Sequence, residues 1–183
     1  MAEQQNGYAI VPHASYNEFR TYLTTHGVNV DYSWGNQCWD SCALLWYQYG
    51  LRLQTGNGYA YGCWELMRYV NAQPPFIMIP NIGDIKRGDV VVFNHFGSVY
   101  TGHIGFADED YNGSGEIKIL GQNQGQGTGP GTASIVTSWD TTNILGAFRN
   151  TNWLITPPTP EPFKKKDKGF NWVIFNRLIK PRR

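Results

Sequence analysis

Apolar and polar positions follow a helical spacing in the first half of the chain. Ser15 and Glu18 form a capping box, so we predict a helix that begins there and runs to about His26. Between Cys38 and Tyr49 the apolar side chains recur on one helix face, which predicts a second helix. A polar, turn-rich loop separates the two helices.

The spacing becomes that of strands in the second half. A third helix is predicted over residues 61–71, and the prolines at 74 and 75 end the helical region. The predicted strands cover residues 89–94, 103–107, 116–120 and 144–149. An Asn-Gly pair at 112–113 is the typical signal of a hairpin between two of them. Helices followed by strands indicate an α+β fold, with N-terminal helices packed on an antiparallel β-sheet.

Length and composition limit the classes of protein to which this chain can belong. The 183 residues suit one domain, of which 16% are charged and 15% are aromatic. No apolar run reaches 18 residues, so no transmembrane helix is expected. Residues 1–6 lack a charged segment followed by an apolar one, so no secretory signal peptide is expected and we predict synthesis in a cytoplasm without export by that route.

Charge divides the chain into two parts. Residues 1–160 hold 7 basic and 12 acidic side chains, a balance that argues against a nucleic-acid-binding surface. Four prolines within residues 156–162 predict an extended linker over 157–163. Residues 164–183 form a basic tail with aromatic side chains, too short to span a bilayer and poorly amphipathic, so we do not expect a membrane partner. The tail is either solvated or docks on a partner through Trp172 and Phe175.

The three cysteines predict a nucleophile more readily than a disulfide or zinc site. Their odd number argues against a disulfide framework, and none lies in a CxxC pair. Cys38 opens a predicted helix, where free N–H groups and partial positive charge favour a thiolate. Cys42 is expected in the core, and Cys63, near another helix start, is the competing candidate.

A histidine is the natural base for such a thiol, because its ordinary pKa lies near neutrality. His103 opens a predicted strand between Gly102 and Gly105, which leave room beside the imidazole. A single histidine in a strand is more often simply packed or hydrogen-bonded. Its pairing with a cysteine at a helix start raises the case for catalysis.

Four motifs in order resemble the CHAP family of cysteine, histidine-dependent amidohydrolases and peptidases. They lie at residues 37–40 (QCWD), 88–93 (GDVVVF), 102–106 (GHIGF) and 122–125 (QNQG). The resemblance covers about residues 12–156 and is strongest to CHAP domains of bacteriophage peptidoglycan hydrolases. It implies a papain-like fold and hydrolysis of amide bonds in bacterial peptidoglycan.

The resemblance also implies roles for single residues. Cys38 would be the nucleophile and His103 the general base, with a thioester intermediate hydrolysed by water. Many relatives carry Glu-Gln-Asn after the histidine strand, and here Gly121 stands at the Glu position. Asn123 matches the family Asn and is predicted to hold the imidazole, with Gln122 or a water sharing that role. Gln124 and the residues after it could equally be a turn.

Two further predictions concern the oxyanion and a metal. The backbone N–H of Cys38 is the natural oxyanion donor, and Gln37 could add a side-chain donor, with Gln122 also near the substrate. Asn29, Asp31 and Asp40 offer oxygen ligands around a tight loop, and some relatives bind calcium through such a loop. The competing interpretation is that Asn29 and Asp31 form Asx turns while Asp40 caps the Cys38 helix.

The resulting functional expectation is a peptidoglycan hydrolase, either an endopeptidase or an N-acetylmuramoyl-L-alanine amidase. It would act as a phage endolysin after release, or as a virion-associated lysin held to tail proteins through residues 164–183. The competing hypothesis is a catalytically weak or inactive structural or wall-binding component of a phage particle, for which Gly121 would be a symptom. Most aromatic side chains around Cys38 are expected in the core, with one or two lining the groove.

Overall fold

The computed structural model describes residues 4–5, 8–9, 12–66, 70–129 and 131–154. The helices are α1 (Tyr16–Thr25), α2 (Cys38–Tyr47) and α3 (Gly62–Glu65), with 3-10 turns η2 (Ile82–Asp84), η3 (Thr141–Asn143) and η4 (Thr151–Leu154). Within these residues no helix is long and apolar enough to cross a membrane.

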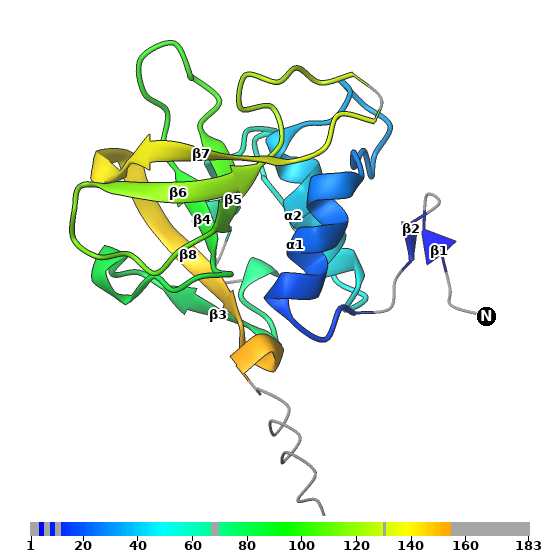
Figure 1. The fold of residues 1–183 in the computed structure, drawn as a ribbon, viewed down its shortest axis with the longest axis horizontal. Helices are drawn as coiled ribbons and strands as arrows, with labels where there is room; N and C mark the ends of the chain where they lie inside the picture. Colours follow the sequence, from blue (N-terminus) through cyan, green and yellow to red (C-terminus); the bar gives the residue numbers. More distant parts are fainter. Residues whose placement is uncertain (1–3, 6–7, 10–11, 67–69, 130, 155–183) are drawn as a thin grey trace, which may run out of the picture.

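A six-stranded antiparallel sheet forms the other half of the fold. Its order is β3-β8-β4-β5-β6-β7, and α1 and α2 lie together on one side of it (Figure 1). The strands are β3 (Phe76–Ile79), β4 (Val90–Phe93), β5 (His103–Ala107), β6 (Glu116–Gly121), β7 (Ile135–Asp140) and β8 (Ile144–Asn150). A separate two-stranded sheet pairs β1 (Gln4–Gln5) with β2 (Tyr8–Ala9).

Apolar side chains cover both faces of the central strands. Val90 and Val92 of β4 pack in the cluster beneath the helices, whereas Val91 and Phe93 belong to a second cluster. This alternation follows from the two-residue period of a strand. It explains why β4 is an uninterrupted β-branched and aromatic run, since a strand buried on both faces needs no polar positions.

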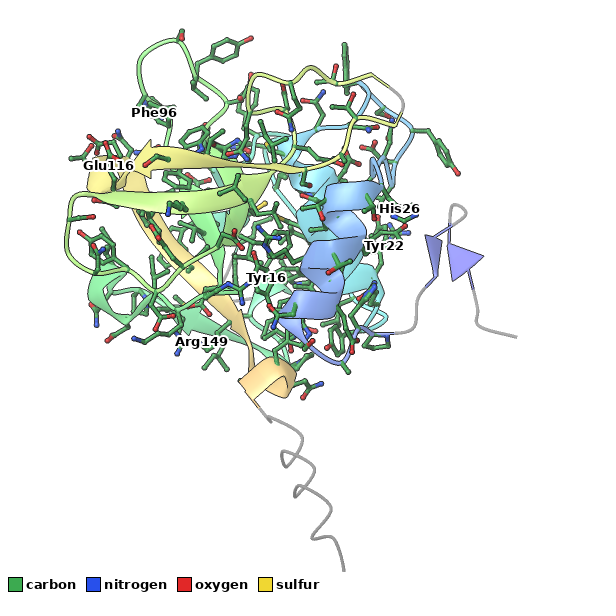
Figure 2. All side chains as sticks on the ribbon, viewed as in Figure 1. Tyr16, Tyr22, His26, Phe96, Glu116 and Arg149 are labelled. Atoms are coloured by element: carbon green, nitrogen blue, oxygen red, sulfur yellow. The ribbon has the colours of Figure 1, made fainter. Side chains whose placement is uncertain are left out.

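Helix α1 is tied to the end of β5 by a polar network. Arg20 donates two hydrogen bonds to the Asp108 carboxylate, at 2.7 and 2.8 Å, and the Tyr16 hydroxyl donates a third at 3.0 Å. Tyr16, labelled in Figure 2 at the start of α1, is largely buried, and that burial together with Asp108 raises the pKa of its hydroxyl. Phe19 packs edge-on against Phe106, so α1 is held both by apolar and by charged contacts.

Helix α2 positions the candidate nucleophile. Its central residues are buried, and Trp46 stacks on Phe76 of β3 with ring centroids 3.9 Å apart. At its other end, Asp40 accepts from the backbone N–H groups of Gln37 and Val30, both at 2.8 Å. The helix is therefore anchored at both ends, and Cys38 is its first residue.

The α+β, papain-like class predicted from the sequence is confirmed. The helices beginning near Ser15 and at Cys38 and all four predicted strands are present, within a few residues. Of the helix predicted over 61–71, the structure describes α3 over Gly62–Glu65 and π-helical backbone at 70 and 71, while 67–69 lie outside the described residues. Strands β3 and β7 were not predicted: both are sheet edges with mixed exposure, so neither shows a clean apolar pattern. The predicted linker and tail, 157–183, lie outside the described residues.

Candidate active site

The Cys38 thiol lies in the wall of a surface cleft of about 1110 Å³. The first turn of α2 carries the thiol, and the same cleft is lined by Trp34, Gln37, Arg52, Tyr59 and Tyr100. Cys42, one turn deeper, and Cys63 are fully buried, so neither competes for a substrate in the cleft. The structure thus favours Cys38 over Cys63 as the reactive thiol on accessibility alone.

Burial decides the resting protonation state of Cys38. It raises the pKa of the thiol to about 11, against the lowering effect of hydrogen bonds from the backbone of Ile104 and Trp39. The thiolate expected from a helix N-terminus is therefore not the resting form. The cost of desolvating a charge outweighs the partial positive charge of the first helical turn.

His103 is the first residue of β5, and the backbone of the next residue, Ile104, contacts Cys38. Because the backbone of Ile104 is hydrogen-bonded to the Cys38 sulfur, this thiol and the start of β5 are neighbours. His103 is only 4% exposed. Its ring stacks on that of Trp139 in β7, with the ring centroids 4.2 Å apart and an angle of 8° between the ring planes. Within the described residues the sulfur and the imidazole share no hydrogen bond.

Burial also keeps the imidazole neutral. It lowers the pKa of His103 to about 3, while the side chain of Gln124 acts in the opposite direction. The resting pair is therefore a thiol and a neutral imidazole. Such a pair can react only if the imidazole accepts the thiol proton as the bond to substrate forms.

Asn123 does not contact the imidazole in this geometry. Its side chain is exposed, and its Nδ2 donates to Oε1 of Gln37 at 2.9 Å. The backbone of Asn123 has φ of 54°, a left-handed conformation that asparagine tolerates. Within the described residues His103 Nε2 is buried without a hydrogen-bond partner. The role predicted for Asn123 therefore stays a prediction that this geometry does not support.

Gln122 and Gln37 hold the loops around Cys38. Gln122 is fully buried; its Oε1 accepts from the Val28 N–H at 2.7 Å, and its Nε2 donates to Val28 O and Gln37 O. Both of its amide protons are therefore used, which leaves none for an oxyanion. Gln37 Nε2 donates to the carbonyl of Trp34, so this side chain would have to break a bond to serve a substrate.

The loop predicted to bind calcium uses its carboxylates for backbone contacts. Both oxygens of Asp40 accept backbone N–H groups, and Asp31 Oδ1 accepts from Ser33 N at 2.8 Å in an Asx turn. Nowhere in the described part of the chain do three His, Cys, Asp or Glu side chains gather as metal ligands. Calcium needs six to eight oxygens, so the set of Asn29, Asp31 and Asp40 does not fit the ion, and calcium binding stays a prediction from the sequence.

Exposed aromatic rings surround the cleft. Trp34 is 89% exposed and Tyr100 is 70% exposed, and Tyr59 packs edge-on against Tyr100. Large exposed rings beside a reactive thiol are suited to stacking on sugars or peptides. The sequence placed aromatic residues near Cys38 but could not say which would face solvent.

A family model and a phage protein match this chain. Residues 27–123 match the family model described as the CHAP domain. A D-alanyl-L-alanine endopeptidase of Streptococcus phage B30 is 32% identical over 119 residues, which are 63% of this chain and 26% of that protein. This chain therefore spans about a quarter of the length of that relative.

Solved structures show the same fold. The endolysin LysIME-EF1 has a TM-score of 0.59 and 23% identity, covering 75% of this chain and 64% of that one. Ly7917, solved with a hydrolysis product of MDP, has a TM-score of 0.50 and 17% identity, covering 74% of this chain and 62% of that one. At these identities the likeness concerns the fold.

Proposed function

Because this chain belongs to the CHAP domain family, we propose that it hydrolyses amide bonds of bacterial peptidoglycan with Cys38 as nucleophile and His103 as base. The observation that carries the proposal is the position of Cys38. Its thiol opens α2, lines an aromatic cleft and lies against the backbone of β5 next to His103. The name of the 32% identical phage relative favours an endopeptidase over an amidase.

The reaction proceeds through a thioester. His103 accepts the thiol proton as the sulfur attacks the carbonyl carbon of the scissile amide, and the C–N bond breaks when the same proton passes to the leaving amine. Water then attacks the thioester, releasing the acid and restoring the thiol. Since the sulfur and the ring share no hydrogen bond at rest, substrate binding must bring them together, as is common for catalytic groups before a substrate is bound.

The proposal is tested by lysis of Gram-positive cell walls. Wild type should reduce the turbidity of a wall suspension and Cys38→Ala should not. Cys42→Ala is the matched control, because Cys42 lies one turn deeper on the same helix and is fully buried. Equal clearing by wild type and Cys38→Ala would overturn the proposal. Mass spectrometry of the released fragments then identifies which bond is cut.

A structural or wall-binding role is the second candidate. It is favoured by Gly121, which stands where many relatives resembling this chain carry a glutamate. Absence of clearing by wild type, together with cosedimentation of the protein with intact walls, would support that role. Clearing that depends on Cys38 would exclude it.

The site of action is proposed from the sequence alone. We propose action on the wall after release from the host cell or from within the virion, with residues 164–183 as the contact to tail proteins. Deletion of residues 157–183 distinguishes a released lysin from a virion-associated one. A released lysin should keep full wall lysis and has no virion association to lose. A tail-anchored lysin should disappear from purified particles.

A further inference from the structure

Arg52 differs from the other basic side chains of the described residues because it has no carboxylate partner. Arg20 is paired with Asp108 and Arg149 with Asp89, each with an N–O distance of 2.7 Å. The remaining ion pairs, with N–O distances of 3.3 to 3.7 Å, are Lys86–Asp110, Lys118–Glu109 and Arg87–Asp108. No carboxylate oxygen of the described residues lies within 4.0 Å of the Arg52 guanidinium.

Arg52 is exposed and lines the same cleft as Cys38. Among the described residues that form this cleft, it is the only basic one, and the acidic ones are Asp31 and Asp40. Asp40 is 1% exposed, and both of its oxygens accept backbone N–H groups. Asp31 is exposed, and its Oδ1 accepts from the backbone N–H of Ser33. The cleft therefore offers one unpaired cation to an incoming substrate.

The backbone on both sides of Arg52 is held in place. The N–H of Leu51 donates to a carbonyl in the last turn of α2 at 3.0 Å, and Leu53 is only 2% exposed. Gln54 is tied to the carboxamide of Asn71, which accepts from the Gln54 N–H at 2.9 Å and donates to the Gln54 carbonyl at 2.8 Å. An anchored backbone lowers the entropic cost of binding through the side chain that it carries.

Arg52 belongs to the end of the cleft that Tyr47 forms. Burial raises the pKa of the Tyr47 hydroxyl and the positive charge of Arg52 opposes that rise, so the two side chains are near each other. Tyr47 is the last residue of α2 and Cys38 is the first. A helix of 10 residues is about 15 Å long, which an extended peptide spans with about four residues. An anion bound beside Tyr47 is therefore remote from the bond that the thiol would attack.

We propose that Arg52 is a specificity-determining residue that binds a free carboxylate of the wall peptide, remote from the scissile amide. The inference rests on the proposed function and names the substrate class. A planar guanidinium matches a carboxylate with two parallel hydrogen bonds. A carboxylate is favoured over the phosphate of another wall polymer, because the proposed cleavage acts on peptides and a peptide that fills the cleft brings its own carboxylates to Arg52.

The binding test uses the full chain with Cys38→Ala, which should not turn over a substrate. The probes are the wall stem peptide L-alanyl-γ-D-glutamyl-L-lysyl-D-alanine and the same peptide with both carboxylates converted to carboxamides. NMR titration should show about 5- to 20-fold tighter binding of the acid form at low salt, a preference that shrinks as salt is added. Equal affinity for the two forms, or no saturable binding of the acid form, would overturn the proposal.

Two substitutions of Arg52 assign the preference to its guanidinium. Arg52→Met removes the charge and keeps an apolar stem, so it should abolish the preference for the acid form. Arg52→Lys keeps the charge but lacks the planar fork, so it should retain only part of that preference. Both variants should fold, because Arg52 is exposed and has no ion pair with a described residue. An undiminished preference in Arg52→Met would overturn the proposal.

Lys118→Met is the matched control for net charge. Lys118 is an exposed cation outside the cleft, so its loss lowers the total charge by the same amount. This variant should keep the full preference for the acid form. A loss as large as that in Arg52→Met would assign the effect to overall charge and overturn the role of Arg52. Arg52-dependent binding of soluble poly(glycerol phosphate) that is tighter than binding of the acid peptide would overturn the assignment to a peptide.

Kinetics then separate this inference from the proposed function. In wall digestion, Arg52→Met should raise KM about 5- to 20-fold and change kcat less than about twofold, because a remote contact stabilises the bound substrate and the transition state equally. An unchanged KM would overturn the inference while leaving the proposed hydrolysis intact. If wild type digests no walls, the proposed function fails, and the peptide titration still decides whether Arg52 binds a carboxylate.

Discussion

Two desolvated groups of weak intrinsic reactivity, a half-buried thiol and a buried imidazole, dominate the site at the scale of single residues. The thiol of Cys38 and the imidazole of His103 have pKa values displaced to about 11 and about 3, each because burial disfavours its charged form. Both groups are therefore uncharged over the whole physiological pH range. The proposed mechanism therefore requires proton transfer within a bound complex and not a preformed ion pair.

The pH profile of kcat/KM should show this directly. His103 can accept a proton only while it is neutral, and a pKa near 3 keeps it neutral down to acidic pH. The acid limb should therefore lie below about pH 5, well under the ordinary histidine value of 6.5. Turbidity assays between pH 3 and 8 locate it. A limb centred near 6.5 would contradict a buried base.

Trp34 offers a second prediction at this scale. It is 89% exposed in the cleft wall, so its truncation removes little from the core. Trp34→Ala should weaken wall digestion by raising KM about 5- to 30-fold, corresponding to loss of about 1–2 kcal/mol of stacking, while the melting temperature stays within a few degrees. An unchanged KM would remove Trp34 from the substrate groove.

At the scale of elements, the packing of α3 against β8 depends on one glycine. Gly146 of β8 has φ of 152°, and a Cβ there would overlap the ring of Trp64 in α3. Backbone strain and steric overlap therefore act together at this position.

Gly146→Ala should lower the free energy of unfolding by about 2–4 kcal/mol in urea titrations, because both the strand backbone and Trp64 must shift. Gly83→Ala is the control: no atom lies within 4 Å of the place that a methyl group at Gly83 would occupy, and its φ is not in the left-handed range. Loss of stability in the control alone, or equal loss in both, would contradict this account of β8.

The cap of α2 gives a further prediction for an element. Asp40→Ala removes the acceptor of two buried backbone N–H groups, from Val30 and Gln37, and should destabilise the fold by about 1–3 kcal/mol. A chelator should leave the melting temperatures of wild type and variant unchanged, because the Asp40 carboxylate accepts hydrogen bonds from the backbone. A chelator-dependent melting temperature in wild type alone would restore Asp40 as a calcium ligand.

At the scale of the whole molecule, burial of His103 ties stability to pH. Between pH 6.5 and about 3 the unfolded chain binds a proton at this histidine that the folded chain does not, so stability falls as the pH falls. Asp40 acts in the opposite direction, because burial raises its pKa to about 6 and the folded chain then binds the extra proton.

The His103 contribution is isolated by comparing wild type with His103→Asn. From pH 6.5 to 4.5 wild type should lose about 2–3 kcal/mol more unfolding free energy than the variant, while Asp40 affects both equally. Urea titrations at four pH values measure the difference. Parallel curves for the two proteins would contradict the burial of a neutral imidazole.

The local pattern of the sequence determined most of the elements. The capping box at Ser15, the helix opening at Cys38 and the strand runs of β4, β5, β6 and β8 each carry their own signal of spacing and residue type. Strands β3 and β7 carry no such signal in the sequence, because an edge strand is specified by the neighbouring strand to which it is hydrogen-bonded. The nucleophile and the base could likewise be proposed from a cysteine at a helix start, a histidine between small residues and the order of the motifs.

Tertiary structure alone decided the ionisation and the partners of these residues. The sequence favoured a thiolate at Cys38 and an Asn123 contact to the ring, but desolvation keeps the thiol neutral and Asn123 turns to Gln37. Trp139, fifteen residues beyond Gln124, stacks on the His103 ring and donates a hydrogen bond to the carboxamide oxygen of Gln124. Burial and amide orientation are set by side chains distant in the sequence, and no local spacing encodes them.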